Sequence, residues 1–177
     1  MRALFVLLLV AACAGQPEYR DEAAPPETAA ALDLTSYQGR WHEIMRYPNR
    51  FEEGCADVTA DYALRADGRV AVTNTCVRDG ETSTAEGVAR RTGEATLEVR
   101  FAPAWLSWLP PVWGDYWVLH VKGDYEAALV GSPDGKYLWV LARQPVLPDE
   151  TLTRMRAEAE ARGYDASALV LTPRSGA

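Results

Sequence analysis

Apolar and polar residues alternate along short segments in the middle of the chain, and turn sequences separate these segments. Residues 69–73 and 96–101 alternate with a period of two, as strands with one buried face do. Turn sequences recur at Asp67-Gly68, Asp79-Gly80, Thr92-Gly93-Glu94, Lys122-Gly123-Asp124 and Pro133-Asp134-Gly135. This regular punctuation predicts an all-β antiparallel meander, and the pattern is compatible with either a sandwich or an up-and-down barrel.

A single helix is predicted after the last strand, which we place over residues 137–143. Asp149 and Glu150 favour its positive N-terminal end, although Pro148 stands where a capping serine or threonine is usual, and Gly163 lies where a C-terminal cap belongs. The apolar segment 168–171 adds a short final strand. The apolar stripe of the helix consists of Leu152, Met155 and Ala159.

The first residues have the form of a secretory signal peptide over residues 1–12, with a basic residue followed by an apolar run. The run is about half the length of the ~20 apolar residues that a membrane-spanning helix needs. It ends in Val10-Ala11-Ala12-Cys13, which resembles the processing box of bacterial lipoproteins, where the cysteine becomes the lipidated first residue. The alternative is ordinary signal cleavage beside an incidental cysteine. Residues 13–32 lack periodic apolar positions and predict a flexible linker, followed by a domain over 33–173 and a tail over 174–177.

Composition narrows the classes of function. The 177 residues are 48% hydrophobic, enough for one well-cored domain beside the targeting segment. A net charge of −7 argues against nucleic acid as a partner. With two histidines, three cysteines and no recognisable catalytic, metal-binding or phosphate-binding motif, we expect no catalytic residues, no metal and no cofactor.

Two cysteines remain once Cys13 is assigned to the processing box. Strands over 58–64 and 70–77 fold around the turn at 65–68, and this hairpin brings Cys55 within a residue or two of Cys76. A disulfide between them fits an exported protein. The alternatives are two buried free thiols or one reactive thiol.

Three segments together resemble the lipocalin family, most closely its bacterial outer-membrane lipoprotein branch. They are Tyr37-Gln38-Gly39-Arg40-Trp41-His42-Glu43-Ile44, Gly114-Asp115-Tyr116 and Tyr137-Leu138-Trp139-Val140-Leu141-Ala142-Arg143. The resemblance covers residues 34–173 and implies an eight-stranded barrel with a helix packed outside and a short closing strand. It also implies that Gly39 and Trp41 close one end of the barrel, and that Arg143 lies across the indole.

Strand phase suggests which polar residues enter the barrel. Trp41, Glu43 and Met45 share one face, and His42 falls on the opposite one. Glu43 is either a polar anchor for a ligand or water, or a hydrogen-bonded residue that fixes the base of the barrel. His120 is in phase with Tyr116, on a face that the resemblance turns inward, which makes it a candidate polar contact.

The segment 101–113 is unusually apolar for a loop. It contains Phe101, Trp105, Trp108 and Trp113, and the resemblance places it at the open mouth of the barrel. It is either an exposed binding or membrane-contact patch, or a lid with its tryptophans turned inward. Trp139 extends the same apolar lining deeper.

The resemblance implies a non-enzymatic carrier of a fatty acid or lysophospholipid, anchored by lipid at Cys13 to the outer membrane and facing the periplasm. Alternatives are an enzyme on the same barrel, or a structural envelope lipoprotein that docks a partner through its tryptophan-rich loop. The oligomeric state stays open, with a dimer as one option. The expected ligand-binding residues are Glu43, Met45, Phe101, Trp105, Trp108, Trp113, Tyr116, His120 and Trp139.

Overall fold

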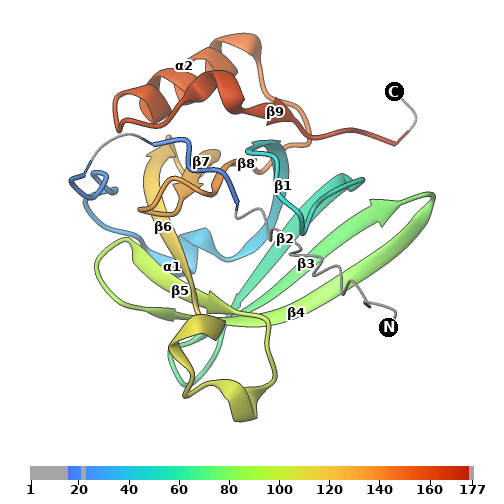
Figure 1. Cartoon of the computed structure of the whole chain (residues 1–177), viewed down its shortest axis with the longest axis vertical. Helices are drawn as coiled ribbons and strands as arrows, with labels where there is room; N and C mark the ends of the chain where they lie inside the picture. Colours follow the sequence, from blue (N-terminus) through green and yellow to red (C-terminus); the bar gives the residue numbers. More distant parts are fainter. Residues whose placement is uncertain (1–15, 21–22, 176–177) are drawn as a thin grey trace, which may run out of the picture.

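The computed structural model describes residues 16–20 and 23–175, so the predicted signal peptide and Cys13 lie outside the described residues. Nine strands and a C-terminal helix dominate this part of the chain (Figure 1). In order, the elements are α1 (Leu34–Tyr37), β1 (Gly39–Arg46), β2 (Ala56–Leu64), β3 (Val70–Arg78), β4 (Glu81–Arg91), β5 (Thr96–Arg100), the 3₁₀ turns η1 (Ala104–Leu106) and η2 (Pro110–Val112), β6 (Gly114–Lys122), β7 (Ala127–Gly131), β8 (Leu138–Ala142), α2 (Asp149–Glu160), η3 (Ala166–Ala168) and β9 (Val170–Leu171).

Strands β1 to β8 form a closed antiparallel up-and-down barrel. Each strand pairs with the next in sequence, and β1 pairs with both β2 and β8. The structure therefore confirms the barrel that the resemblance implied and excludes the sandwich. Because neighbouring strands run in opposite directions, the connections after β1, β3, β5 and β7 all lie at one end, which we call the mouth.

Helix α2 and strand β9 lie outside the barrel, as expected (Figure 1). Met155 and Ala159 of α2 are fully buried, and Gly163 follows the helix with a φ of +80°. Strand β9 pairs with β1 at Met45 and Arg46, whereas β2 pairs with β1 only as far as His42. The C-terminal strand thus takes the place of β2 beside β1 at the mouth.

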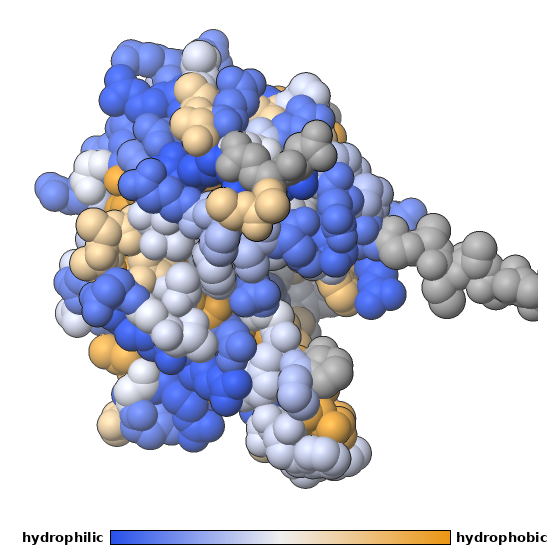
Figure 2. All heavy atoms as spheres, turned by 60° about the vertical axis from the view of Figure 1, so that its left-hand side comes forward, coloured by the Kyte–Doolittle hydropathy of each residue, from blue (hydrophilic) through white to orange (hydrophobic). Residues whose placement is uncertain are grey.

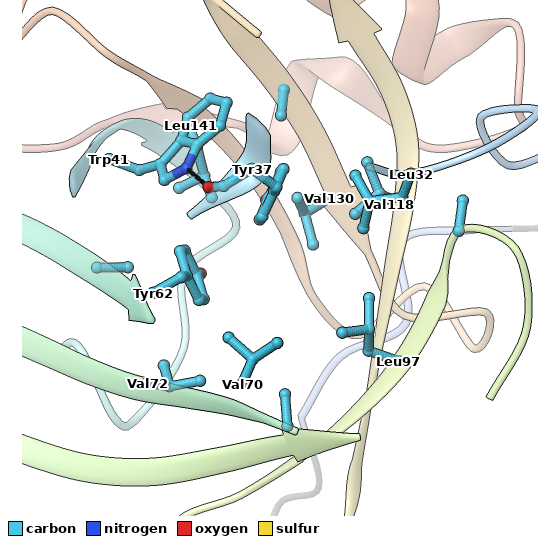
Figure 3. Packing of buried hydrophobic residues seen from close by; sticks show 14 residues of the cluster. Leu32, Tyr37, Trp41, Tyr62, Val70, Val72, Leu97, Val118, Val130 and Leu141 are labelled. Atoms are coloured by element: carbon cyan, nitrogen blue, oxygen red, sulfur yellow. Dashed lines mark hydrogen bonds between the residues drawn. The ribbon is translucent and has the colours of Figure 1, made fainter. Parts of the chain in front are cut away.

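Two apolar clusters hold these layers together. The inner cluster fills the barrel with side chains such as Val72, Val118 and Val130, which converge from different strands (Figure 3). The outer cluster lies between the barrel wall and α2, where Leu129 and Met155 are fully buried. The barrel strands therefore bury side chains on both faces where α2 covers them.

The structure differs from the expected flexible linker in the described residues before the barrel. The backbone N–H of Tyr19 donates to the carbonyl of Gly135 (3.0 Å), and that of Ala29 donates to the carbonyl of Val118 (2.9 Å). Leu32 is buried in the inner cluster. The composition of this segment predicted a spacer. The contacts that order it are made with strands far away in sequence, so they could not be predicted from the local sequence pattern.

Trp41 and Arg143 close the end opposite the mouth. The Trp41 side chain is fully buried, and the Arg143 guanidinium lies 4.0 Å from the centre of its ring. The Arg143 guanidinium also donates to the backbone carbonyls of Ser36 (2.7 Å) and Arg40 (2.9 Å). Gly39 has a φ of +93°, and a Cβ there would lie 3.4 Å from Arg143 Nη1. The expected cation–π closure is confirmed, and it explains why glycine precedes the tryptophan.

Cys55 and Cys76 form the expected disulfide. It ties the loop between β1 and β2 to β3, across 21 residues of sequence. A link of this separation stabilises a fold by roughly 3 kcal/mol, mainly by restricting the unfolded chain. The two alternatives with free thiols are thereby excluded.

We expect Arg143→Lys to lower the free energy of unfolding by about 1–3 kcal/mol. Lysine keeps the charge but loses the planar stack on Trp41 and the several fixed donors of the guanidinium. Urea denaturation followed by tryptophan fluorescence measures the change. Arg40→Lys is the matched control, because Arg40 makes an exposed pair with Asp61 (3.0 Å) and this change should leave the free energy of unfolding nearly unchanged. Equal effects of the two changes would contradict a closing role for Arg143.

Candidate functional site

The barrel encloses an apolar cavity that reaches from the closed end toward the mouth. Its volume is about 110 Å³, below the roughly 300–1,000 Å³ of typical ligand pockets. The wall is mostly aliphatic and aromatic, with a few polar groups. The lining residues are Leu34, Tyr37, Glu43, Glu52, Val58, Thr59, Ala60, Tyr62, Val70, Val72, Asn74, Ala89, Leu97, Val99, Phe101, Tyr116, Trp139 and Leu141.

Three tyrosines form the polar part of the deep wall. The Tyr116 hydroxyl lies 2.7 Å from that of Tyr37 and 2.8 Å from that of Tyr62. The Tyr37 ring packs 4.8 Å from Trp41, which places this group near the closed end. Burial raises the pKa of all three phenols, so they remain neutral and hydrogen-bond to one another.

A second polar group lies on the β1 side of the cavity. Glu43 is only 2% exposed and accepts a hydrogen bond from Thr172 Oγ1 at 2.6 Å. Arg46 Nε lies 3.3 Å from Glu43 Oε1 and 3.5 Å from Glu52 Oε2. Burial, followed by the neighbouring Glu52 carboxylate, raises the pKa of Glu43 well above its usual range. One guanidinium therefore serves two carboxyl groups.

Glu52 joins this group to the mouth of the cavity. Its carboxylate accepts hydrogen bonds from the indole of Trp139, at 3.2 Å, and from the side-chain amide of Asn49. Trp139 stacks on Tyr137 with ring centres 5.5 Å apart. The loop between β1 and β2 thus fixes the orientation of an aromatic side chain on the cavity wall.

Four of the expected ligand-binding residues do line this cavity: Glu43, Phe101, Tyr116 and Trp139. The Phe101 ring lies against Gly87, where an added Cβ would come within 2.8 Å of it. Glu43 also makes the internal hydrogen bond that was the alternative interpretation, so it is at once a structural residue and part of the wall.

Met45 and His120 do not line the cavity, and the expectation that they face inward is wrong. The pairing of β1 with β8 shifts register between Glu43 and Met45, and that of β6 with β7 shifts between Val118 and His120. Each irregularity adds a residue and reverses the phase of the later residues in its strand. Met45 consequently packs in the outer cluster. His120 Nδ1 lies 3.5 Å from Glu158 of α2, and burial lowers the pKa of His120.

The tryptophan-rich loop projects away from the cavity. Trp105 is 73% exposed and Trp108 is 75% exposed, which excludes a lid with these side chains turned inward. The loop forms a lobe beside the barrel and carries apolar residues at its surface (Figures 1 and 2). The Trp113 ring packs against Arg90 and Arg100, whose guanidinium carbons are 4.1 and 5.2 Å from its centre. These arginines alternate with inward residues of β4 and β5, so Trp113 anchors the loop to the outer wall.

Several residues that line the cavity were not predicted from the sequence. Tyr62 alternates in phase with Ala60 on β2, a signal that was available but is shared by every inward residue. Glu52 is adjacent to Glu53 in a polar loop, and nothing in the sequence indicates which of the two glutamates lines the cavity. Asn74 lines the cavity from a strand of otherwise ordinary alternation.

Two further observations concern residues 16–20 and 23–175. Within these ranges, no three or more His, Cys, Asp or Glu side chains gather in a way that could hold a metal ion. No helix among them is both long and apolar enough to span a membrane.

Comparison with known proteins extends these observations. A family model described as a lipocalin-like domain matches residues 32–174. The chain is 39% identical over 155 residues to temperature-induced lipocalin-1 of Arabidopsis thaliana, covering 84% of this chain and 83% of that protein. It is 37% identical over 147 residues to the outer membrane lipoprotein Blc of Escherichia coli K12, covering 82% and 81%. The structure of insecticyanin from the tobacco hornworm Manduca sexta matches with a TM-score of 0.67 at 22% identity, covering 90% of this chain and 88% of that one.

The raised pKa of Glu43 predicts a pH-dependent effect of Glu43→Gln. Because the folded state favours the protonated carboxyl, its contribution to stability is fully present below about pH 4.5 and is lost as pH rises through the raised pKa. Glutamine does not titrate, so the variant escapes this loss. As pH rises from 4 to 8, the difference in the free energy of unfolding between the two proteins should shift in favour of the variant by about 1 kcal/mol or more. Urea denaturation at both pH values measures this difference. Exposed Glu53→Gln should show no such change, and a pH-independent effect of Glu43→Gln would contradict the assignment.

Proposed function

We propose that this chain, which belongs to the lipocalin family, binds the acyl chain of a fatty acid or lysophospholipid in its barrel cavity without transforming it. The observation that carries the proposal is the cavity itself. It is apolar, open toward one end and closed at the other by Trp41 and Arg143. Burial of an acyl chain there contributes about 25 cal/mol for each Å² of apolar surface removed from water, before the entropic costs of binding.

The size of the cavity constrains how a lipid is held. At about 110 Å³ the cavity takes only part of a long chain unless its wall moves. Phe101 lies on the wall near the mouth and is 42% exposed, so its ring has room to swing outward. We infer that ligand entry displaces Phe101 and extends the cavity into the mouth.

The alternative of a lipid-transforming enzyme lacks support in this cavity. A thiol mechanism would need a free cysteine, but Cys55 and Cys76 are joined to each other. The carboxyl group with a raised pKa, Glu43, is engaged by Thr172 and Arg46. These contacts suit a fixed part of the wall better than a mobile acid or base.

We further propose that lipidation at Cys13 anchors the protein to the outer membrane, facing the periplasm. Support comes from the sequence Val10-Ala11-Ala12-Cys13, and from relatives that are named outer membrane lipoproteins. Ala14 stands where aspartate would be associated with retention at the inner membrane. Several acyl chains on one cysteine would hold firmly, since each buried methylene contributes about 0.8 kcal/mol.

The exposed tryptophans support a role for the loop at the membrane surface. Indole rings favour the interface between water and lipid, and Trp105 and Trp108 are the most exposed aromatic side chains of the described residues. We propose that the loop rests on the membrane and shortens the path of a lipid into the nearby mouth. Docking of a protein partner on the same loop is the second candidate.

Lipid binding is tested by native mass spectrometry after purification without detergent. The protein should carry a co-purifying lipid or take up added lysophospholipid. Ala89→Phe places a ring in the cavity and should weaken uptake by at least about tenfold, since overfilling a packed space costs roughly 1–3 kcal/mol. Ala71→Phe is the matched control, because Ala71 does not line the cavity. A folded protein that stays empty and ignores added lysophospholipid would refute the proposal.

The role of the loop is tested by the rate of lipid transfer from vesicles. Trp105→Ser combined with Trp108→Ser should slow transfer several-fold, because the loop loses its affinity for the interface. Its affinity for dissolved lysophospholipid should not change. Val146→Ser removes a side chain that is 74% exposed but lies outside the loop, and should have no effect. An unchanged transfer rate in the double variant would favour the partner-docking candidate.

A further inference from the structure

We propose that the cavity selects single-chain lipids whose head group is cationic or donates hydrogen bonds, and that it discriminates against free fatty acids. This inference rests on the proposed function, because it concerns the ligand of the same cavity. It divides the two lipid classes considered above according to their head groups. Amine-headed and hydroxyl-headed lipids are favoured, whereas a bare carboxylate is not.

The ionisable residues on the cavity wall are acidic. Glu43 and Glu52 both line the cavity, and none of the described lining residues is Lys, Arg or His. A ligand carboxylate at this depth would meet the Glu52 carboxylate, and no Lys, Arg or His of the described lining would pair with it. Juxtaposed like charges are strongly unfavourable where water is excluded. An ammonium or hydroxyl group would instead find acceptors.

Arg46 does not reverse this balance. It is 7% exposed and absent from the lining, and its Nε lies 3.3 Å from Glu43 and 3.5 Å from Glu52. Its Nη2 donates to the backbone carbonyl of Glu52 at 2.8 Å. The positive charge of Arg46 therefore already lies within 3.5 Å of both carboxyl groups, and Arg46 does not line the cavity.

The uncharged polar groups of the wall also favour a head group that donates hydrogen bonds. The three phenols, Tyr37, Tyr62 and Tyr116, hydrogen-bond to one another. Asn74 also lines the cavity, and its Oδ1 is buried with no hydrogen-bond partner among the described residues. A buried acceptor without a donor is costly. Asn74 Oδ1 is thus an unmatched acceptor on the wall, which a ligand N–H or O–H can satisfy.

The position of the carboxyls matches the position of a head group. Strand β1 runs from Gly39 at the closed end to Arg46 at the mouth, and Glu52 lies in the mouth loop after this strand. The phenols lie at the other end, beside Trp41. A chain that enters tail first would bring its head to the level of Glu52. The head group would then lie beside the acidic part of the wall.

Three ten-carbon probes that differ only in their head group test the inference. Decylamine, decanol and decanoate would each displace the neutral dye N-phenyl-1-naphthylamine from the full-length protein, at pH 7.5 and physiological salt. We expect decylamine to bind most tightly, decanol next and decanoate least. The ratio of dissociation constants between decanoate and decylamine should be at least about tenfold, as expected for the difference between a paired and a repelled charge.

A matched pair of variants assigns this ratio to the cavity. Glu52→Gln frees the Arg46 guanidinium, so it should weaken decylamine, strengthen decanoate and reduce their ratio by about tenfold. Glu53→Gln makes the same change of net charge at the adjacent residue, which is exposed and does not line the cavity. Its ratio should match that of the natural protein.

The outcomes separate this inference from the proposed function. If decanoate binds as tightly as decylamine or more tightly, the head-group inference is wrong while lipid binding stands. The inference also fails if Glu53→Gln shifts the ratio as much as Glu52→Gln, because net charge would then explain the preference. If the dye or all three probes fail to bind, the proposed function itself is contradicted.

Discussion

The stacking of Arg143 on Trp41 is the contact on which the rest of the structure depends. It joins the start of the first barrel strand to the residue that follows the last one, and its guanidinium also holds the backbone of the segment before β1. Because this contact closes one end of the barrel, the other end is the mouth, and the cavity has a depth and a direction. The chemistry of the cavity is ordered along that direction, with phenols at the floor and carboxyls near the entrance.

Much of this architecture could be predicted from local sequence. Alternation and glycine-containing turns place the strands and hairpins correctly, and the disulfide between Cys55 and Cys76 follows from the β2–β3 hairpin. Strand phase beyond a bulge could not be predicted in this way. A bulge depends on how two strands pair, so it cannot be predicted from the sequence of either strand alone. The face predicted for Glu43 was therefore right, whereas Met45 and His120, each just past an irregularity, were assigned to the wrong face.

The site was less predictable than the fold because its polar groups come from distant segments. An apolar loop with several tryptophans was evident in the sequence, but its direction depends on Arg90 and Arg100, which hold Trp113 against the outer wall from two other strands. Glu52 and its neighbour Glu53 look alike in sequence, yet only Glu52 reaches Arg46 and Trp139. The acidity of the wall is thus a tertiary property that composition does not reveal.

Strand β9 has a consequence for solubility. Beyond His42, strand β1 no longer pairs with β2, which would leave a row of backbone donors and acceptors exposed at the mouth. Exposed strand edges of this kind invite pairing with other chains and aggregation. The two residues of β9 cover the gap, and the backbone N–H of Thr172 continues the cover by donating to the carbonyl of Ile44 at 3.0 Å. Strand β9 thus covers the β1 edge at the mouth and leaves fewer backbone groups there that could pair with another chain.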